Sequence, residues 1–440
     1  MKVSEVKALD REHIMHTWSV NAKIDPTVIT DVDGVYLIDG EGRRILDFSS
    51  QLKCVNIGHK HPRIIKAIQE QAEKVCYVGP GFAYESRSGL GKALAEVTPG
   101  DLNKFFFVNA GAEANENVIK LARAYTKRQT IISLYRSYHG ATFGAITLTG
   151  DSRRSWVGSG IPGVVHAMNP YCYRCPFGLT YPECDLRCAE HIGEVIKYEG
   201  PQTVAAVILE TVSGAPGIII PPDGYLKRVR EICDENGVVL VADEVMAGFG
   251  RTGQWFAIQN WDVIPDMITM AKGLTSSYIP LGAVAMSKKV SDTLDQEMIY
   301  CGLTYSGHPL SCAAAIATIE VYREERLIEN ARAMGTILNK ELERLKDKHP
   351  CVGDTRSIGL FSCLELVKNK KTKEPLSPKE HAKEINKRLM AKGVYSPVSS
   401  MQPEIYLFAA PPLSTNEDQL REGLTVIDEV LDYVDTLTEN

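Results

Sequence analysis

The middle of the chain alternates short apolar runs with segments of helical periodicity. Residues 203–210 and 237–243 are almost continuously apolar, which is typical of strands covered on both faces of a sheet. Between them, Tyr225–Asn236 has the spacing of an amphipathic helix that ends at Gly237. The same patterns predict strands at 105–109, Thr130–Leu134, Met267–Met270 and 282–287, and a helix at 112–126. This alternation predicts an α/β fold built on a mainly parallel sheet.

The two ends of the chain have a different pattern. Residues 1–60 carry short β patterns around Gly34 and Gly42. Residues from about 330 onwards begin with an amphipathic helix and continue with mixed elements. We therefore expect residues 61–325 to form a large domain, and residues 1–60 and 326–440 to form together a smaller α+β domain.

Charge and hydropathy exclude several classes of partner. The 440 residues include 49 Lys and Arg against 55 Asp and Glu, a net charge of −6. A nucleic-acid sleeve or a polybasic membrane anchor needs the opposite excess. The longest apolar runs are too short to cross a bilayer, and residues 1–10 lack the apolar stretch of a signal peptide. We expect a cytoplasmic protein that binds neither nucleic acid nor membrane.

One group of cysteines stands apart from the rest. The 11 Cys are an odd number and mostly scattered, which fits reduced thiols better than a disulfide framework. Cys172 and Cys175 form a Cys-x-x-Cys pair, and Cys184 and Cys188 follow closely, so a zinc or iron–sulfur site is one interpretation. The gap between the pairs is short for a zinc ribbon. We expect thiols packed against the aromatic side chains of a Pro-rich loop, and no metal; a stoichiometric metal content would overturn this expectation.

Three strand ends carry polar groups. Residues 109–113 follow the first predicted strand, where Gly111 permits a tight turn and the open N–H groups of the helix start form an anion site. Asp243 ends a buried strand, where a carboxylate needs a positive partner. Lys272 follows another apolar run, where burial would lower its pKa and free a nucleophilic amine. Taken singly, each has a structural explanation: a turn, a helix cap or ion pair, or a surface lysine.

The combination is more specific than its parts. Ligands of open α/β sheets bind at the carboxyl ends of the strands. An anion-binding turn, a carboxylate and an amine at three such ends match the phosphate, ring nitrogen and aldehyde of pyridoxal 5′-phosphate. Asp243 and Lys272 are 29 positions apart, which leaves room for one intervening crossover. We therefore expect this cofactor.

With these residues in place, the chain resembles the class III pyridoxal-phosphate aminotransferases of the type I fold over nearly its whole length. The motifs that carry the resemblance follow one another in family order. They are residues 31–36, 56–62, 107–116, 138–140, 243–245, 248–253, 271–273 and 304–307. The resemblance implies an aminotransferase with a large cofactor-binding domain and a smaller α+β domain.

The resemblance also implies a role for each matching residue. Lys272 would form the Schiff base with the cofactor and then carry the catalytic proton, and Asp243 would keep the pyridine nitrogen protonated. Tyr138 and Val245 would contact the two faces of the ring. The other implied cofactor contacts are Gly111 and Ala112 at the phosphate, His139 beside Tyr138, Glu210 near the ring (or balancing an Arg), and Thr304 from a neighbouring subunit. Such sharing implies a homodimer, possibly assembled further into a tetramer.

Departures from the family concern the acid group of the substrate. Relatives acting on ornithine or 4-aminobutyrate carry Gln where this chain has Met246, and an Arg shortly before the C-terminal Pro-Pro-Leu, which this chain lacks. Residues 414–416, just after that motif, also lack the Arg of pyruvate-linked ω-aminotransferases. Another guanidinium must then bind a carboxylate or sulfonate, and Arg153 and Arg154 are the candidates.

The remaining signals concern the amine donor. Trp18 and Phe82 are candidates for its pocket, although core packing is the default for a lone aromatic. Residues 171–178 are similar to an insert of taurine and related ω-amino acid aminotransferases, whereas some 4-aminobutyrate aminotransferases use a Cys-x-x-Cys pair for an iron–sulfur cluster. We expect transfer of an amino group from taurine, β-alanine or a similar ω-amino acid to 2-oxoglutarate or pyruvate by a ping-pong cycle. An aminomutase, an amine phospho-lyase and a non-catalytic relative are the alternatives.

Overall fold

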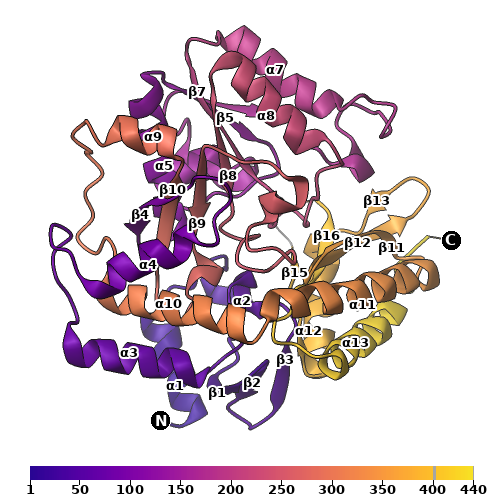
Figure 1. Cartoon of the computed structure of the whole chain (residues 1–440). Helices are drawn as coiled ribbons and strands as arrows, with labels where there is room; N and C mark the ends of the chain where they lie inside the picture. The colour runs from indigo at the N-terminus through magenta and orange to yellow at the C-terminus, as the bar shows by residue number, and fades with distance from the viewer. Residues whose placement is uncertain (400–402, 440) are drawn as a thin grey trace.

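A large mixed sheet forms the centre of the computed structural model, which describes residues 1–399 and 403–439 (Figure 1). Its strand order is β4-β10-β9-β8-β7-β5-β6. The strands are β4 (Lys104–Val108), β5 (Thr130–Leu134), β6 (Val164–Ala167), β7 (Val204–Glu210), β8 (Val239–Asp243), β9 (Met267–Met270) and β10 (Gly282–Met286). Since β10 is antiparallel to both β4 and β9 while the other pairs are parallel, β4 to β9 all end at the same edge.

Helices pack on both faces of this sheet. They are α5 (Gly111–Thr126), α6 (Phe143–Leu148), α7 (Arg187–Glu199), α8 (Tyr225–Asn236) and α9 (Lys288–Leu294). At one end of the sheet, α10 (Pro309–Glu324) packs against α3 (Pro62–Lys74) and α4 (Glu85–Ala95). The strands and helices predicted from periodicity lie within one or two residues of these bounds.

The continuous apolar strands are explained by this double cover. Along β8, Val239 and Val241 join an apolar cluster with α5, whereas Leu240 and Ala242 join the cluster that includes α7 and α8. Alternate side chains of a strand point to opposite faces, so a strand covered on both faces must be apolar at every position. Gly237 ends α8 with φ of 59°, the left-handed conformation that glycine tolerates.

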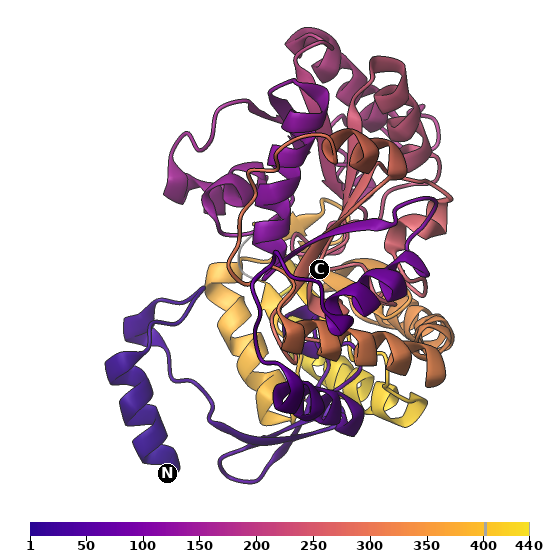
Figure 2. The same ribbon diagram turned by 60° about the vertical axis from the view of Figure 1, so that its left-hand side comes forward.

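The two ends of the chain meet in a smaller sheet with strand order β1-β2-β3-β14. Its strands are β1 (Ile29–Asp33), β2 (Tyr36–Asp39), β3 (Arg44–Asp47) and β14 (Val394–Tyr395), preceded by α1 (Val3–His13) and followed after β3 by α2 (Ser50–Lys53). Val394 pairs with Leu46 in a parallel ladder, so both ends do contribute to one substructure. In Figure 2, α1 stands away from the rest of the chain, and none of its residues is buried.

The C-terminal part adds a further sheet with strand order β11-β12-β16-β15, where β13 pairs with β12. Its strands are β11 (Val352–Ile358), β12 (Phe361–Asn369), β13 (Glu374–Pro375), β15 (Val398–Ser399) and β16 (Ile405–Ala409). The helices α11 (Leu327–Lys348), α12 (Pro378–Ala391) and α13 (Glu417–Asp435) pack on this part (Figure 1).

The predicted fold class is confirmed: a large, mainly parallel α/β unit stands beside a smaller α+β unit. The boundaries expected at residues 60 and 325 stay predictions. Within the described ranges, the protein contains no helix with both the length and the apolar character that a membrane span requires.

Candidate active site

A cavity of about 440 Å³ opens where the central strands end. It lies beyond the carboxyl ends of β4, β7, β8 and β9, where an open α/β sheet binds its ligands. Eight of the residues predicted for the site line it: Gly111, Ala112, Tyr138, His139, Glu210, Asp243, Val245 and Lys272. Segments separated by up to 161 positions in the sequence, from Gly111 to Lys272, therefore meet around one space.

The turn before α5 is built for an anion. The first N–H groups of α5, like those of any helix, have no partner within the helix. Ala110, which precedes the helix, provides no side-chain cap for them. A Cβ added at Gly111 would lie 2.7 Å from Val245 Cγ1, which explains why glycine stands there. Bare helix N–H groups and the helix dipole favour a phosphate at this position.

Asp243 presents a buried carboxylate whose orientation is fixed. The residue is 3% exposed, and its Oδ2 accepts hydrogen bonds from Asn115 Nδ2 (2.8 Å) and from His139 Nδ1 (2.7 Å). Its Oδ1 accepts a hydrogen bond from the Val245 amide (3.0 Å). Burial opposes protonation of His139, but the hydrogen bond to Asp243 and the charges of Asp243 and Glu210 outweigh it and raise the His139 pKa. The arrangement suits a protonated ring nitrogen facing Asp243.

Lys272 supplies the amine at the same edge. It follows β9 and starts a short 3₁₀ helix (Lys272–Leu274) with φ of 43°, a conformation rare for residues other than glycine. Tyr322 stabilises this turn by donating a hydrogen bond from its hydroxyl to the Gly273 carbonyl (2.8 Å). Burial lowers the Lys272 pKa, although Cys54, Glu210 and Asp243 oppose the change. In the part of the chain that is described, the Lys272 amine forms no hydrogen bond or ion pair, so it is available to an aldehyde.

Glu210 has a positioning role in the structure. It pairs in register with Asp243, and its carboxylate accepts hydrogen bonds from the backbone amides of Tyr138 (2.8 Å) and Gly214 (2.9 Å). Burial raises the Glu210 pKa, while the positive charge of His139 opposes the rise. The sequence left open a contact with the cofactor or the balancing of an Arg. The contact with the Tyr138 amide connects Glu210 to the loop that carries Tyr138, and a contact of Glu210 with the cofactor stays a prediction.

The structure separates the two candidate arginines. The guanidinium carbon of Arg153 lies 4.0 Å from the centroid of the Tyr138 ring and 5.3 Å from that of Trp18. Trp18 in turn packs edge-on against Tyr138, with 5.7 Å between the ring centroids. Arg154 instead contacts His166 (3.0 Å) and lies over the ring of Tyr135, away from the residues that line the cavity.

Two further predicted residues lie on the surface. Phe82 is 69% exposed, and its carbonyl accepts a hydrogen bond from Arg87. Thr304 is exposed, and its carbonyl accepts a hydrogen bond from Tyr77 (2.8 Å). Neither lines the cavity within this chain; the role of Phe82 in the amine pocket and that of Thr304 in a shared site stay predictions.

Two residues near the cavity were not predicted. Asn115 donates to both Asp243 and the His139 carbonyl (2.7 Å). It lies one helical turn after Gly111, and this spacing in the sequence could have indicated that the two residues share one face of the helix. Lys53 is buried close enough to Lys272 for their charges to interact, and the sequence around it carries no comparable signal.

These features together fit pyridoxal 5′-phosphate. The N–H groups at the start of α5 would hold its phosphate, Asp243 its ring nitrogen and Lys272 its aldehyde, with Tyr138 and Val245 beside the ring. All five groups border one cavity, as a single small planar ligand requires.

Comparison with known proteins supports this interpretation. The family model described as "Aminotransferase class-III" matches residues 17–431. The solved taurine:2-oxoglutarate aminotransferase from Bifidobacterium kashiwanohense, in complex with PLP and glutamate, is 43% identical with a TM-score of 0.94 over 99% of both chains. The putrescine–pyruvate aminotransferase of Pseudomonas aeruginosa is 35% identical over 98% of this chain and 96% of its own length. A leucine/methionine racemase from Thermococcus litoralis is 37% identical over 92% of this chain and 90% of its own. The chain therefore belongs to the class III aminotransferases and is a pyridoxal 5′-phosphate-dependent enzyme.

Proposed function

We propose that this aminotransferase takes the amino group from a terminal amine that carries an acid group at its other end. Taurine, β-alanine and similar ω-amino acids form this class, and 2-oxoglutarate or pyruvate would accept the amino group in a ping-pong cycle. The observation that carries the proposal is the position of Arg153 beside Tyr138 and Trp18.

Arg153 has the chemistry to recognise the acid group. Asp151 holds its guanidinium through hydrogen bonds from Nε (2.9 Å) and Nη2 (2.5 Å), which fix its orientation. A guanidinium has five N–H donors, so these two contacts leave N–H groups for a second anion. Its positive charge reaches Lys272 and contributes to the lowered pKa of that amine. The family's usual guanidinium positions, before and after Pro-Pro-Leu, are not occupied by Arg in this chain.

The relatives support a terminal amine as donor. The names of two of them specify taurine, a terminal amine with a sulfonate, and putrescine, a terminal diamine. An acid-bearing amine matches the first of these and uses Arg153. The racemase relative shows that a similar chain can act on an α-amino acid, and this defines the competing activity.

The side chains divide the work of the reaction. When bound, pyridoxal phosphate withdraws electrons and so stabilises negative charge at the amine-bearing carbon of the substrate. Asp243, held by Asn115 and His139, keeps a proton on the ring nitrogen. Lys272 moves a proton to and from the reacting carbon, a role that its lowered pKa favours. Arg153 binds the distal acid group and thereby fixes the distance between that group and the amine.

We also propose a homodimer with shared active sites. Thr304 and Phe82 are exposed outside the cavity of their own chain, and α1 has no buried residue. Contacts with a second copy would cover these groups and bring Thr304 to a neighbouring phosphate site. Sedimentation would test the dimer, and it would also distinguish a dimer from a tetramer. A Thr304→Ala variant that keeps its full affinity for the cofactor would count against the shared site. The cytoplasmic location stays a prediction.

The function is tested by half-reactions. Taurine, β-alanine, putrescine and α-amino acids are each mixed with the cofactor-loaded enzyme, and the cofactor's absorbance is followed before pyruvate or 2-oxoglutarate is added. The proposal requires conversion by taurine or β-alanine and recovery on adding an oxo acid. Conversion by none of the amines would exclude transamination of this class. Ammonia release without an oxo acid, or racemisation of an α-amino acid, would assign a different reaction to the same site.

A further inference from the structure

We propose that the segment carrying Cys172, Cys175, Cys184 and Cys188 binds one zinc ion through its four thiolates. All four cysteines line the same cavity, which has a volume of about 20 Å³. A space of this size suits one small ion or one water molecule. From the sequence, packing against aromatic side chains was the expected arrangement; the convergence of four thiols on one small space is what favours the metal.

The local backbone brings the two cysteine pairs together. Cys172 begins the 3₁₀ helix η3 (Cys172–Arg174), and the next residue, Cys175, closes a turn by accepting a hydrogen bond from the Gly178 amide (3.1 Å). The Cys184 amide donates to the Thr180 carbonyl (2.9 Å), which forms a second turn. Cys188 lies in the first turn of α7. Two turns and the start of a helix therefore present the four cysteines, and two cysteine pairs are the usual framework of a zinc site.

The environment of the four sulfur atoms differs from that of four of the other seven thiols in this chain. Cys54, Cys76, Cys351 and Cys363 each place their sulfur against a backbone carbonyl. Within residues 1–399 and 403–439, the four cluster sulfurs make no such hydrogen bond and no disulfide. Their thiols instead lie near one another: Cys172 interacts electrostatically with Cys175 and Cys184, and Cys188 with Cys172 and Cys184.

The size of the cavity favours zinc over an iron–sulfur cluster. A single ion fits about 20 Å³, whereas a cluster contains several iron and sulfide atoms. A tetrahedral zinc–thiolate site holds its sulfurs roughly 3.8 Å apart, given Zn–S bonds of about 2.3 Å. Among the described residues, three potential ligand atoms lie within 4.8 Å of one another only in the group of His349, Asp428 and Asp432. No three of the cysteine sulfurs are that close together, so they lie further apart than in a closed zinc site. Zinc binding must therefore draw the two turns together.

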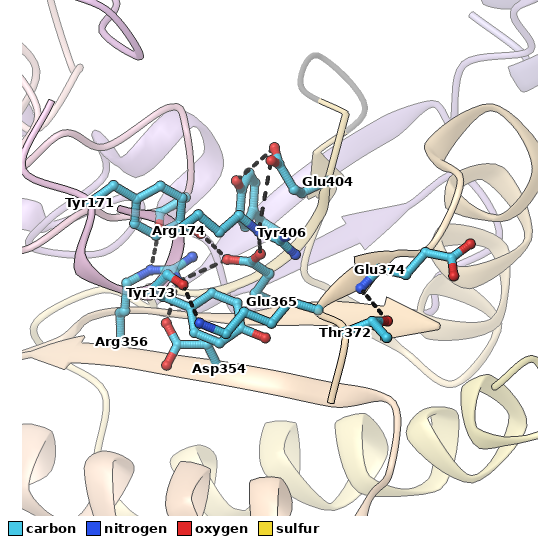
Figure 3. Close-up of polar contacts among 12 residues, drawn as sticks. Tyr171, Tyr173, Arg174, Asp354, Arg356, Glu365, Thr372, Glu374, Glu404 and Tyr406 are labelled. Atoms are coloured by element: carbon cyan, nitrogen blue, oxygen red, sulfur yellow. Dashed lines mark hydrogen bonds and ion pairs between the residues drawn. The ribbon is translucent and has the colours of Figure 1, made fainter. Parts of the chain in front are cut away.

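Zinc would stabilise the cysteine-bearing segment, which contacts β12 of the C-terminal sheet. Figure 3 shows Tyr171, which precedes the first cysteine pair, and Arg174, which lies between its two cysteines, reaching the buried Glu365 of β12. The Arg174 Nε lies 2.6 Å from Glu365 Oε1, and Arg356 of β11 approaches the other carboxylate oxygen at 2.9 Å. Since these contacts depend on the conformation of the loop, metal binding and the packing of this loop on β12 should be coupled.

The first test uses the wild-type holoenzyme. The protein is purified without a metal-affinity step, and its zinc and iron are measured by mass spectrometry. The proposal requires about one zinc per chain, released when a mercurial reagent blocks the thiols. Apoprotein given Co²⁺ should show the sulfur-to-cobalt charge-transfer absorption of thiolate ligands. Absence of zinc, or iron in its place, would overturn the proposal.

Variants then assign the ligands. Cys172→Ser and Cys184→Ser should each lose the zinc, with a lower Tm, while the cofactor's absorbance reports that the large domain still folds. Cys76→Ser is the matched control, because Cys76 is exposed and lies outside the cluster. Zinc retained at full occupancy in both cluster variants would show that these cysteines do not bind it. If a variant fails to fold, the wild-type metal content and the cobalt spectrum still decide.

Discussion

Replacing Lys53 would test how charge is balanced beside the active site. This lysine is 8% exposed, and its amine lies 3.7 Å from the centroid of the Phe408 ring. Burial, with the positive charges of Lys272 and Arg251, lowers the Lys53 pKa from 10.5 to about 7, although Asp47 opposes the change. The folded protein therefore disfavours the protonated form of Lys53, which the unfolded chain would keep up to about pH 10.5.

The sign of the pH dependence follows from this lowered pKa. Above pH 10.5 the amine is neutral in both the folded and unfolded states. As the pH falls from 10.5 to about 7, the unfolded chain binds a proton that the folded protein does not, so the folded state loses stability. Below about pH 7 the loss is complete, and a pKa lowered from 10.5 to about 7 corresponds to about 5 kcal/mol.

Lys53→Met removes the titrating amine and keeps most of the apolar stem. We expect the gain in unfolding free energy to be about 3 kcal/mol larger at pH 6.5 than at pH 9.5. The contact of the charged amine with Phe408 offsets about 1 kcal/mol of that difference. For 440 residues, the remaining 2 kcal/mol or so corresponds to a Tm difference of about 2 °C.

The assay is calorimetry of the cofactor-free protein at the two pH values, because a bound cofactor would add its own pH-dependent stability. Lys66→Met is the matched control: the Lys66 side chain is 74% exposed and lies near Glu70. Equal Tm shifts for Lys53→Met at both pH values would refute the reasoning, because they would show that Lys53 keeps its ordinary pKa when folded.

Three further substitutions test the site and the contacts around it. Arg153→Gln should lower kcat/KM for taurine or β-alanine by about 10- to 100-fold, the cost of a charge-assisted hydrogen bond, while putrescine turnover changes little; an equal loss for both amine types would remove Arg153 from acid recognition. Asp243→Asn should lower kcat by about 100-fold or more and also lower the His139 pKa, which NMR titration would follow; unchanged turnover would show that the carboxylate is not needed. Arg136→Met leaves the buried Glu404, whose Oε1 lies 2.7 Å from Arg136 Nη2, without this partner. It should destabilise the protein by about 3–5 kcal/mol, with recovery in the double variant with Glu404→Gln; a Tm unchanged by Arg136→Met would contradict the importance of the pair.

Four cavity-lining residues could be predicted because each lies at or just after the end of a strand, whereas Tyr138, His139 and Val245 were indicated by the family resemblance. The apolar runs that end at Glu210 and Asp243 mark strands covered on both faces, and parallel strands bring their ends to one edge. Gly111 and Lys272 obey the same rule. For these residues a local pattern determines a position in space, so the sequence is sufficient to group them.

The arrangement of Arg153 and Arg154 was not predictable in the same way. Both lie in the 3₁₀ helix η2 (Ser152–Val157), where successive side chains point about 120° apart. One side chain therefore reaches Tyr138 while the next reaches His166. No property of two adjacent, identical residues tells which of them contacts a residue of a cavity formed by distant segments.

Long-range polar contacts were also beyond a linear analysis. Arg251 belongs to a motif of the family; in the structure it is fully buried and donates to the carbonyls of Leu360 and Pro411 and to Asn56. It therefore joins three separate segments. Arg136 and Glu404 are 268 positions apart, and neither lies in a pattern that points to the other.

The division between predictable and unpredictable residues follows the chemistry that they serve. Groups at strand ends would touch the cofactor, whose shape is constant, so fixed backbone positions are enough to hold them. The groups that would touch a variable substrate, such as Arg153 and Trp18, come from connecting segments, whose length and conformation can change without moving the sheet. Substrate class in this chain is therefore expected to respond to changes in these segments while cofactor binding persists. A chimera that exchanges residues 151–158 with a relative of different substrate preference should shift the donor and keep the cofactor; loss of the cofactor together with the substrate would show that the two functions are not separable in this way.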